Sequence, residues 1–314
     1  MARNKIQFQK GLSESGFYAL YGTEQQCVEA LEQMRWPKGF ICPACGHDAG
    51  HRLHTRALTQ CASCRTQTSV TAGTIFHRTK LPLTTWFRAM YHLTQSKNGV
   101  SAIELMRRLG VAYNTAWMLK HKLMQVMKER EAGKTLTDRV ELDDAYIGGE
   151  RPGKPGRGAE GKTPFIAAIQ TDLDGKPQKM ALHTVSGFTK EQVRHFAEQK
   201  LDPGTDVYSD GLACFAAVID QGCSHTVTIT GGGRKAAQNP TFRWVNTALG
   251  NIKSALIGTY RHIDAKHVPR YLAEFQYRFN RRNDLAGMIT RLSYVSLRTP
   301  PMPYNLLKMA ELPG

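Results

Sequence analysis

The sequence predicts a mixed α/β protein in which a small cysteine-bearing module and a helical segment precede the main domain. Three observations support this prediction. Two cysteine pairs lie near the N-terminus, a helical periodicity follows them, and strand and helix patterns then alternate over residues 139–283. A chain of 314 residues with 41% hydrophobic content can bury one large core and carry smaller modules beside it.

The charge of the chain indicates a polyanionic partner. Its 42 Lys and Arg residues outnumber its 26 Asp and Glu residues, which gives a formal net charge of +16. A surface of this sign attracts polyanions, and nucleic acid is the leading candidate. No apolar stretch approaches the roughly 18 residues of a membrane span. Residues 1–10 also lack the apolar segment of a secretory signal, so we expect a cytoplasmic protein that binds no membrane.

Residues 1–39 are predicted to form a helical lead-in to the cysteines. Apolar side chains recur at roughly helical spacing over residues 17–35. Thr23 and Gln26 have the pattern of a capping box, in which each side chain satisfies a backbone amide at the start of the helix.

Residues 40–80 contain the cysteine spacing of a zinc ribbon, with fifteen residues between the two pairs Cys42, Cys45 and Cys61, Cys64. Each Cys-x-x-Cys turn can present two thiolates to one tetrahedral Zn²⁺. Four protein ligands leave no position for a catalytic water, so the zinc should be structural. The alternative is four unmetallated thiols. The other cysteines show no partner spacing and are predicted to be buried: Cys27, Cys214 and Cys223.

Residues 81–132 are predicted to be helical and to resemble a helix-turn-helix. Trp86, Met90 and Leu93 share one face of a first helix, and Gly110 separates two further apolar periodicities. A helix, a glycine turn and a second helix are typical of proteins that read DNA. The second helix carries groups suited to phosphates or base edges, namely Asn114, Lys120, His121 and Lys122. An ordinary helical hairpin with a solvated basic face is the alternative.

Residues 133–283 have the element order of a ribonuclease H-like mixed sheet. Three strand patterns are predicted at 139–147, 163–171 and 180–186, separated by turn-forming residues. A helix at 190–199, a strand ending at Asp210, a helix near 213–220, a strand at 226–229 and a long helix over 244–260 follow. In this order the first and fourth strands are neighbours.

Two acidic residues are placed where that topology would bring them together. Asp143 lies in the first strand and Asp210 closes the fourth. Strand alternation puts Glu141 on the same face as Asp143 and turns Asp144 to the other face. We therefore favour Asp143 as a metal ligand, with Glu141 as a neighbour. The alternative is that both aspartates only end strands on a solvated rim.

The last helix would add an oxygen ligand and a cation to the same edge. Asn246 opens this helix, and Lys253 lies seven residues later on the same side, where it can bind a phosphate. Asn251 is a competing ligand but lies well around the helix from Lys253. Two divalent ions about 4 Å apart, held by such oxygens, can activate a hydroxyl and stabilise a leaving oxygen in phosphoryl transfer.

Motifs along most of the chain resemble the zinc-ribbon DDE-type insertion-sequence transposases, specifically the ISXO-like transposase family. The resemblance rests on both cysteine pairs and on the segments at 35–37, 39–40, 73–76, 141–149, 209–211, 258–260 and 275–282. These segments read RWP, GF, GTIF, ELDDAYIGG, SDG, GTY and FQYRFNRR.

The resemblance implies a transposase that cleaves DNA at element ends and transfers the strands into target DNA. It assigns Asp143, Asp210 and Asn246 to two catalytic Mg²⁺ or Mn²⁺ ions, with Lys253 beside them. Asn246 departs from the commoner glutamate and supplies one negative charge fewer. Double-stranded DNA of the element ends and of the target would be the partner. A homo-oligomer on DNA and a nucleoid-associated location in a bacterium would follow.

Three further segments of the chain are basic. The stretch 148–162 contains Arg157 and other cations among glycines, and it is either a DNA-contacting hairpin or a solvated loop. The GGGRK sequence at 231–235 lacks Walker spacing, so no nucleotide site is expected. A helix over 268–282 is predicted to pack on the sheet and to face DNA with its basic end, including Arg281 and Arg282.

Residues 284–314 are predicted to be a C-terminal tail. Two rival functions are also compatible with the sequence. One is a DNA-binding regulator whose ribonuclease H-like core has lost activity, with Asn246 as the trace of that loss. The other is a structure-specific DNA nuclease that cuts without joining.

Overall fold

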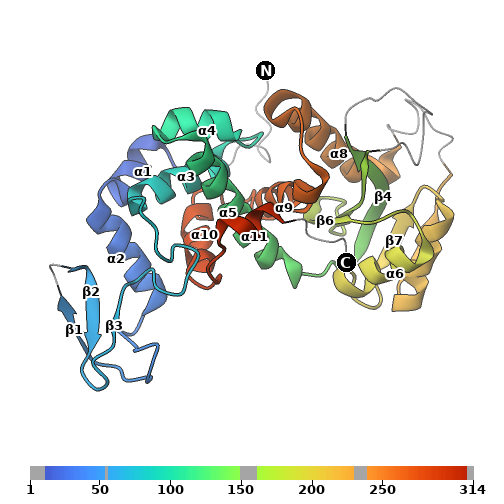
Figure 1. Ribbon diagram of the computed structural model, residues 1–314. Coiled ribbons are helices and arrows are strands. Elements are labelled where there is room, and N and C mark those ends of the chain that lie inside the picture. The colour runs from blue at the N-terminus through green and yellow to red at the C-terminus, as the bar shows by residue number, and fades with distance from the viewer. Residues whose placement is uncertain (1–10, 54–55, 149–160, 230–238, 310–314) are drawn as a thin grey trace. The chain divides into compact units, whose positions relative to one another are not determined.

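The computed structural model describes residues 11–53, 56–148, 161–229 and 239–309 (Figure 1). The chain divides into two compact units. The first contains Met1–Lys97, Ala102–Val126 and Asp284–Lys308, and the second contains Asn98–Ser101, Met127–Asn283 and Met309–Gly314. No helix in the described ranges combines the length and the apolar character needed to cross a lipid bilayer.

The first unit combines helices with a small antiparallel sheet in the order β1-β2-β3. Its strands are β1 Gly50–Leu53, β2 Leu58–Cys61 and β3 Gln67–Thr68. Its helices are α1 Glu14–Tyr21, α2 Glu24–Arg35, α3 Leu83–Gln95, α4 Ala102–Leu109, the first part of α5 Tyr113–Ala132, α10 Met288–Ser296 and α11 Tyr304–Lys308.

The local signals in this unit act as the sequence predicts. Thr23 and Gln26 form a reciprocal capping box at the start of α2, which confirms that prediction. Trp86, Met90 and Leu93 are buried on α3. Gly110 has a φ of +69° between α4 and α5, a backbone conformation that side chains disfavour, so the helical run is interrupted there.

The C-terminal residues contain helices that the sequence analysis did not predict. Helix α10 packs against α2 and α3. The hydroxyls of Thr290 and Tyr21 are 3.2 Å apart, and the Gln95 side chain donates to the Leu285 carbonyl at 2.8 Å. Ile289 and Leu292 are fully buried. Residues 284–308 therefore belong to the core of the first unit.

A five-stranded mixed sheet forms the centre of the second unit as described, in the order β6-β5-β4-β7-β8. Its strands are β4 Arg139–Ile147, β5 Thr163–Thr171, β6 Pro177–Thr184, β7 Asp206–Ser209 and β8 Ser224–Val227. β4, β5 and β6 are antiparallel neighbours, whereas β4 is parallel to β7 and β7 is parallel to β8. The mixed α/β class and the predicted strand order are confirmed.

Two apolar layers cover the faces of this sheet. On one face, Val140 and Leu142 of β4 pack with α6 (Lys190–Lys200) and the 3₁₀ helix η2 (Ala213–Gln221). On the other face, Ala145 and Ile147 pack with α8 (Arg243–Ala255) and α9 (Val268–Phe279). Because successive side chains of a strand point to opposite faces, β4 contributes residues to both apolar layers.

Several boundaries differ from the sequence predictions. β6 begins three residues earlier than predicted, at Pro177. The predicted helix near 213–220 is a 3₁₀ helix, and the predicted long helix over 244–260 consists of α8 and a π-helical turn, η4 Leu256–Tyr260. Short helices η3 (Pro240–Phe242) and η5 (Ala265–His267) precede α8 and α9.

Helix α9 protects the edge strand β6. The Asn280 side chain, just past α9, accepts from the Met180 amide at 2.7 Å and donates to the Met180 carbonyl at 3.0 Å. Gln276 accepts from the Leu182 amide at 2.9 Å. These side chains satisfy backbone groups that a further strand would otherwise pair with, which blocks edge-to-edge association.

Candidate active site and cysteine cluster

Three carboxylates converge between the middle of β4 and the C-terminal end of β7. Oxygens of Asp143, Asp144 and Asp210 all lie within 4.8 Å of one another. The parallel register pairs Leu142 with Ser209, so Asp143 and Asp210 are the next residues on neighbouring strands. The topology therefore brings Asp143 and Asp210 together, as the strand order predicts.

Asp144 is part of this cluster, although strand alternation predicts that it points away. Alternation fixes the direction of Cβ, but it does not fix the position of a carboxylate oxygen at the end of a flexible side chain. Asp210 also lies one residue beyond the last paired position of β7, so the pleat does not restrict its side chain. Only the three-dimensional arrangement shows that Asp144 reaches the other two acids.

The cluster disfavours its own negative charge. Burial first, and then the charges of Asp144 and Asp210, raise the pKa of Asp143 to about 7. The Asp144 amide, which donates to Asp143 Oδ1 at 2.9 Å, and the Lys253 ammonium act in the opposite direction. Grouped, partly buried carboxylates of this kind are suited to a divalent cation, because the cation offsets their mutual repulsion.

Glu141 connects β4 to the start of α8. It is buried, and its Oε2 accepts hydrogen bonds from the amides of Trp244 and Val245 at 2.8 and 2.9 Å. Its other oxygen accepts from Arg139 Nη1 at 3.1 Å. Burial raises the pKa of Glu141, and these donors oppose that shift. The predicted neighbour of Asp143 thus holds the first turn of α8 against the strand.

An open pocket of about 680 Å³ lies between the carboxylates and α8. Asp143 and Asp144 line it from β4, and Asn246 and Lys253 line it from α8. Among the described residues, neither Asp210 nor Asn251, the competing ligand candidate, lines this pocket, although Asp210 belongs to the carboxylate cluster beside it. Acidic oxygens, an amide oxygen and an ammonium therefore face one space.

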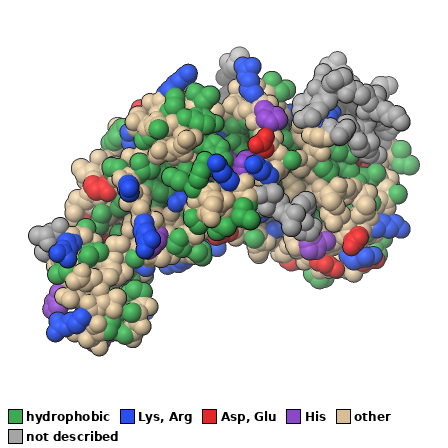
Figure 2. All heavy atoms as spheres, in the orientation of Figure 1, with side chains coloured by type: hydrophobic (Ala, Val, Ile, Leu, Met, Phe, Trp, Pro, Cys, Tyr) green, Lys and Arg blue, Asp and Glu red, His purple; other side chains and the backbone are tan. Residues whose placement is uncertain are grey.

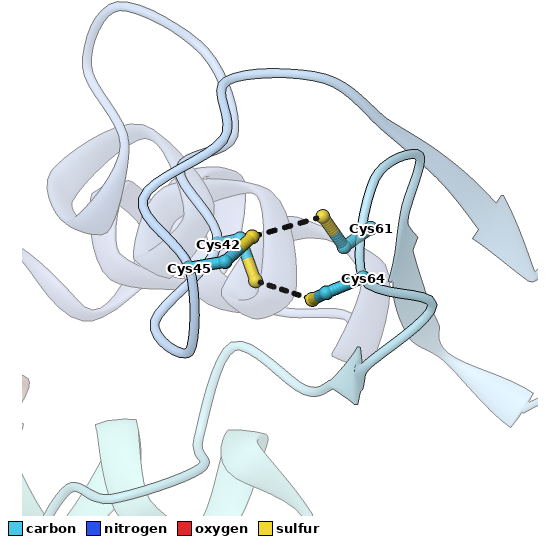
Figure 3. A group of neighbouring side chains, drawn as sticks. All are labelled: Cys42, Cys45, Cys61 and Cys64. Atoms are coloured by element: carbon cyan, nitrogen blue, oxygen red, sulfur yellow. Dashed lines mark hydrogen bonds between the residues drawn. The ribbon is translucent and has the colours of Figure 1, made fainter.

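The four cysteines of the two pairs form a second cluster, in the first unit. Figure 3 shows the sulfurs of Cys42 and Cys45 turned toward those of Cys61 and Cys64. The sulfurs of Cys42 and Cys64, and those of Cys45 and Cys61, are 3.6 Å apart. A tetrahedral ion with metal–sulfur bonds of about 2.3 Å requires sulfurs roughly 3.8 Å apart. The arrangement therefore fits a single tetrahedral ion.

The predicted DNA-contacting residues of α5 differ in their exposure. Asn114 is exposed on its first turn, and Lys122 is partly buried with its ammonium 5.9 Å from the centre of the Trp86 ring. Lys120 is fully buried, which is at odds with its predicted contact to a phosphate. Lys120 lies four residues after Ala116 and three before Leu123, on the buried face of α5, so the apolar periodicity itself places it inside. Arg157 and the GGGRK segment lie outside the described residues.

Arg281 and Arg282 also require a correction. Arg281 is buried and its guanidinium contacts the Glu131 carboxylate at 2.6 Å. Arg282 donates to the carbonyls of Pro177 and Gln178 in the edge strand. These contacts hold both side chains against other parts of the second unit, which does not agree with the predicted DNA-facing role of this basic end.

Exposed cations do not form one continuous patch on the face drawn in Figure 2. Lysine and arginine side chains are scattered there among apolar and uncharged atoms. The cations on this face therefore do not locate a DNA-binding site by themselves.

Comparison with known families decides the class of protein. Residues 135–280 match the family described as the ISXO2-like transposase domain, and residues 22–67 match the transposase zinc-ribbon domain. The two matches together span more than half of the chain. The chain is an insertion-sequence transposase of this family. The match over 135–280 includes Asp143, Asp210, Asn246 and Lys253, and the resemblance inferred from the motifs is confirmed.

A relative supports the same conclusion for this transposase. A protein of Halobacterium salinarum, described as an uncharacterized protein in transposable element ISH50, is 23% identical over 281 residues. The similarity covers 82% of the transposase and 90% of the relative. Because a transposase acts on DNA, nucleic acid is the partner that the positive charge accommodates.

Proposed function

We propose that this transposase cleaves DNA at the ends of its insertion sequence and joins the freed strands to target DNA within a ribonuclease H-like core. The observation that carries the proposal is the convergence of Asp143 and Asp210 beside the helix that bears Asn246 and Lys253. The strand order β6-β5-β4-β7-β8, with its mixture of antiparallel and parallel pairs, supports the fold assignment.

The oxygen ligands of the pocket fit hard divalent cations. Carboxylate and amide oxygens suit Mg²⁺ or Mn²⁺, and Asp143, Asp210 and Asn246 would hold them. When bound, two such ions supply an activated oxygen nucleophile and stabilise the leaving oxygen. Asp144 contributes the third carboxylate that Asn246 does not provide. The amide is therefore compatible with an active site rather than the mark of an inactive one.

Other residues orient the substrate and the site. Lys253 projects from α8 into the pocket, where its ammonium binds a DNA phosphate as a point charge. Glu141 fixes the start of α8 relative to β4, so Asn246 and Lys253 stay in register with Asp143. Both residues act by positioning the substrate or the ligands, and such positioning is a main contribution of an enzyme to phosphoryl transfer.

The first unit would recognise the element ends. We propose that the four cysteines bind structural Zn²⁺, because four thiolates complete a tetrahedron and leave no open position. We also propose that α4, the Gly110 turn and α5 act as a helix-turn-helix, with Asn114 and Lys122 as the candidate contacts to DNA. A homo-oligomer would synapse the two ends.

A strand-transfer assay tests the proposal. The purified chain is incubated with Mg²⁺ or Mn²⁺, a duplex carrying the element's own end, and a target plasmid. We expect end cleavage and joined products, both lost in Asp143→Asn and in Asp210→Asn, while end binding is retained. Binding without cleavage by the wild-type chain would instead favour the regulator with an inactivated core, and cleavage without joining would favour a nuclease.

A further inference from the structure

Helix α8 presents a second cation to the catalytic pocket. Arg243 is the first residue of α8, it is exposed, and it lines the same pocket as Lys253. The two residues are ten positions apart, which corresponds to about 15 Å along the helix axis. Asn246 lies between them. The carboxylate cluster therefore faces a helix surface with a cation toward each end.

The Arg243 guanidinium is held in place without being neutralised. Its central carbon lies 5.0 Å from the centre of the Trp244 ring. Trp244 is itself fixed, because its indole donates to the Gly175 carbonyl at 2.6 Å and its amide donates to Glu141. Within the described part of the chain, Arg243 takes part in no ion pair. A cation stacked on an aromatic ring keeps its outward N–H donors for a ligand.

We propose that Arg243 binds a backbone phosphate of the DNA strand that occupies this pocket, at a different phosphate from the one bound by Lys253. The inference rests on the proposed function and extends it by naming a second point of contact. A planar guanidinium matches two phosphate oxygens at once, which suits Arg243 to this ligand.

The spacing of the two cations supports two separate phosphates. One strand of a duplex carries a phosphate for about every 3.4 Å of helix axis, so a span of about 15 Å covers several phosphates. With Lys253 beside the acidic cluster, Arg243 would hold the same strand some nucleotides away. Two contacts at a distance fix the direction of the strand across Asp143 and Asp210, which a single contact does not.

Salt dependence of DNA binding measures the contact directly. The full-length chain is titrated with a duplex carrying the element's end, and with a random duplex of the same length, at several KCl concentrations. No Mg²⁺, Mn²⁺ or chelator is added, so catalysis is absent and the cysteine cluster is undisturbed. The variants are Arg243→Gln, Arg243→Lys and, as a charge-matched control, Lys190→Gln at the exposed start of α6.

We expect Arg243→Gln to weaken binding several-fold on both duplexes and to reduce the slope of log affinity against log salt by about 0.9, the value of one phosphate contact. Arg243→Lys keeps the positive charge and should keep the slope. Lys190→Gln should match the wild type. A wild-type slope in Arg243→Gln overturns the inference. An equal loss of slope in Arg243→Gln and Arg243→Lys, with lowered melting temperatures, also overturns it.

The outcome separates this inference from the proposed function. If the wild-type chain fails to cleave with Mg²⁺ or Mn²⁺, the proposed chemistry fails, although the slope still reports whether Arg243 contacts DNA. If the wild type cleaves and the slope of Arg243→Gln is unchanged, only the Arg243 contact is wrong.

Discussion

The Glu141 carboxylate accepts hydrogen bonds from the Trp244 and Val245 amides at 2.8 and 2.9 Å, and this contact joins the strand of Asp143 to the helix of Asn246. A carboxylate at a helix N-terminus satisfies amides that have no partner within the helix and interacts favourably with the helix dipole. The active-site geometry therefore depends on an acid that does not line the pocket.

Glu141→Gln should lower the cleavage rate at saturating DNA, while the DNA concentration for half-maximal rate changes little. The amide replaces one acceptor oxygen with a donor, so either Arg139 or the pair of α8 amides loses its acceptor, at a cost of about 1–3 kcal/mol in stability. Single-turnover cleavage and thermal denaturation measure the two effects. Glu198→Gln, on the exposed side of α6, is the control. An unchanged rate in Glu141→Gln would show that α8 does not need this contact.

Asp144 and Asn246 can be separated as contributors to metal binding. If Asp144 compensates for the neutral Asn246, Asp144→Asn should raise the Mg²⁺ concentration for half-maximal cleavage by roughly 10–100-fold. Asn246→Glu adds a negative charge and should lower that concentration. Asp174→Asn, on the exposed turn between β5 and β6, should leave it unchanged. If Asp144→Asn needs the same Mg²⁺ concentration as the wild type for half-maximal cleavage, Asp144 does not contribute to metal binding.

The cysteine cluster should hold the zinc ion on which binding to element ends depends. Cys61→Ser removes one of four ligands, so bound zinc should fall from one ion per chain and binding to element ends should weaken. Zinc content by mass spectrometry and end binding by fluorescence anisotropy give the two readings. Cys223→Ser, a buried thiol of the second unit, should retain the zinc. Undiminished zinc and end binding in Cys61→Ser would contradict the metal assignment.

Arg281 is expected to stabilise the second unit and not to bind DNA. Arg281→Gln removes one of two cations that contact the buried Glu131 carboxylate, the other being Lys134, and the loss of this charged contact costs about 1.5–3 kcal/mol. Arg281→Gln should therefore lower the melting temperature markedly and leave the salt dependence of DNA binding unchanged. The opposite pattern, with a normal melting temperature and a reduced salt slope, would restore the DNA-facing role that the sequence suggested.

What the sequence predicted is mostly local, and what it missed depends on distant partners. β4 and β5 were predicted with their observed bounds because recurring apolar residues in β4, and a continuous apolar run in β5, lie between turn-forming segments. Asp143 and Asp210 were paired correctly because strand order alone brings them together. Arg281 was misplaced because its partner, Glu131, lies 150 positions away. Helix α10 was not predicted for the same reason, because its apolar face packs against α2 and α3, which are distant in the sequence.

The acid sensitivity of the second unit should depend on His183. Burial, followed by the charges of Lys200, His195 and Lys128, lowers the pKa of His183 to about 4. An unfolded histidine titrates near a pKa of about 6.5, so between these values the unfolded chain binds more protons than the folded one. The stability that neutral His183 contributes is therefore present above a pH of about 6.5 and is lost as the pH falls toward 4.

His183→Gln removes this titration and should make the melting temperature fall less steeply between pH 6.5 and 4.5. Some dependence should remain, because burial also lowers the pKa of His92, in the first unit, to about 4. His262→Gln, at an exposed histidine, should keep the wild-type dependence. Differential scanning calorimetry across this pH interval measures the slopes. Glutamine does not titrate, so the variant has no contribution from position 183 to the dependence of stability on pH. If His183→Gln loses stability with acid as steeply as the wild type, other groups cause the acid sensitivity.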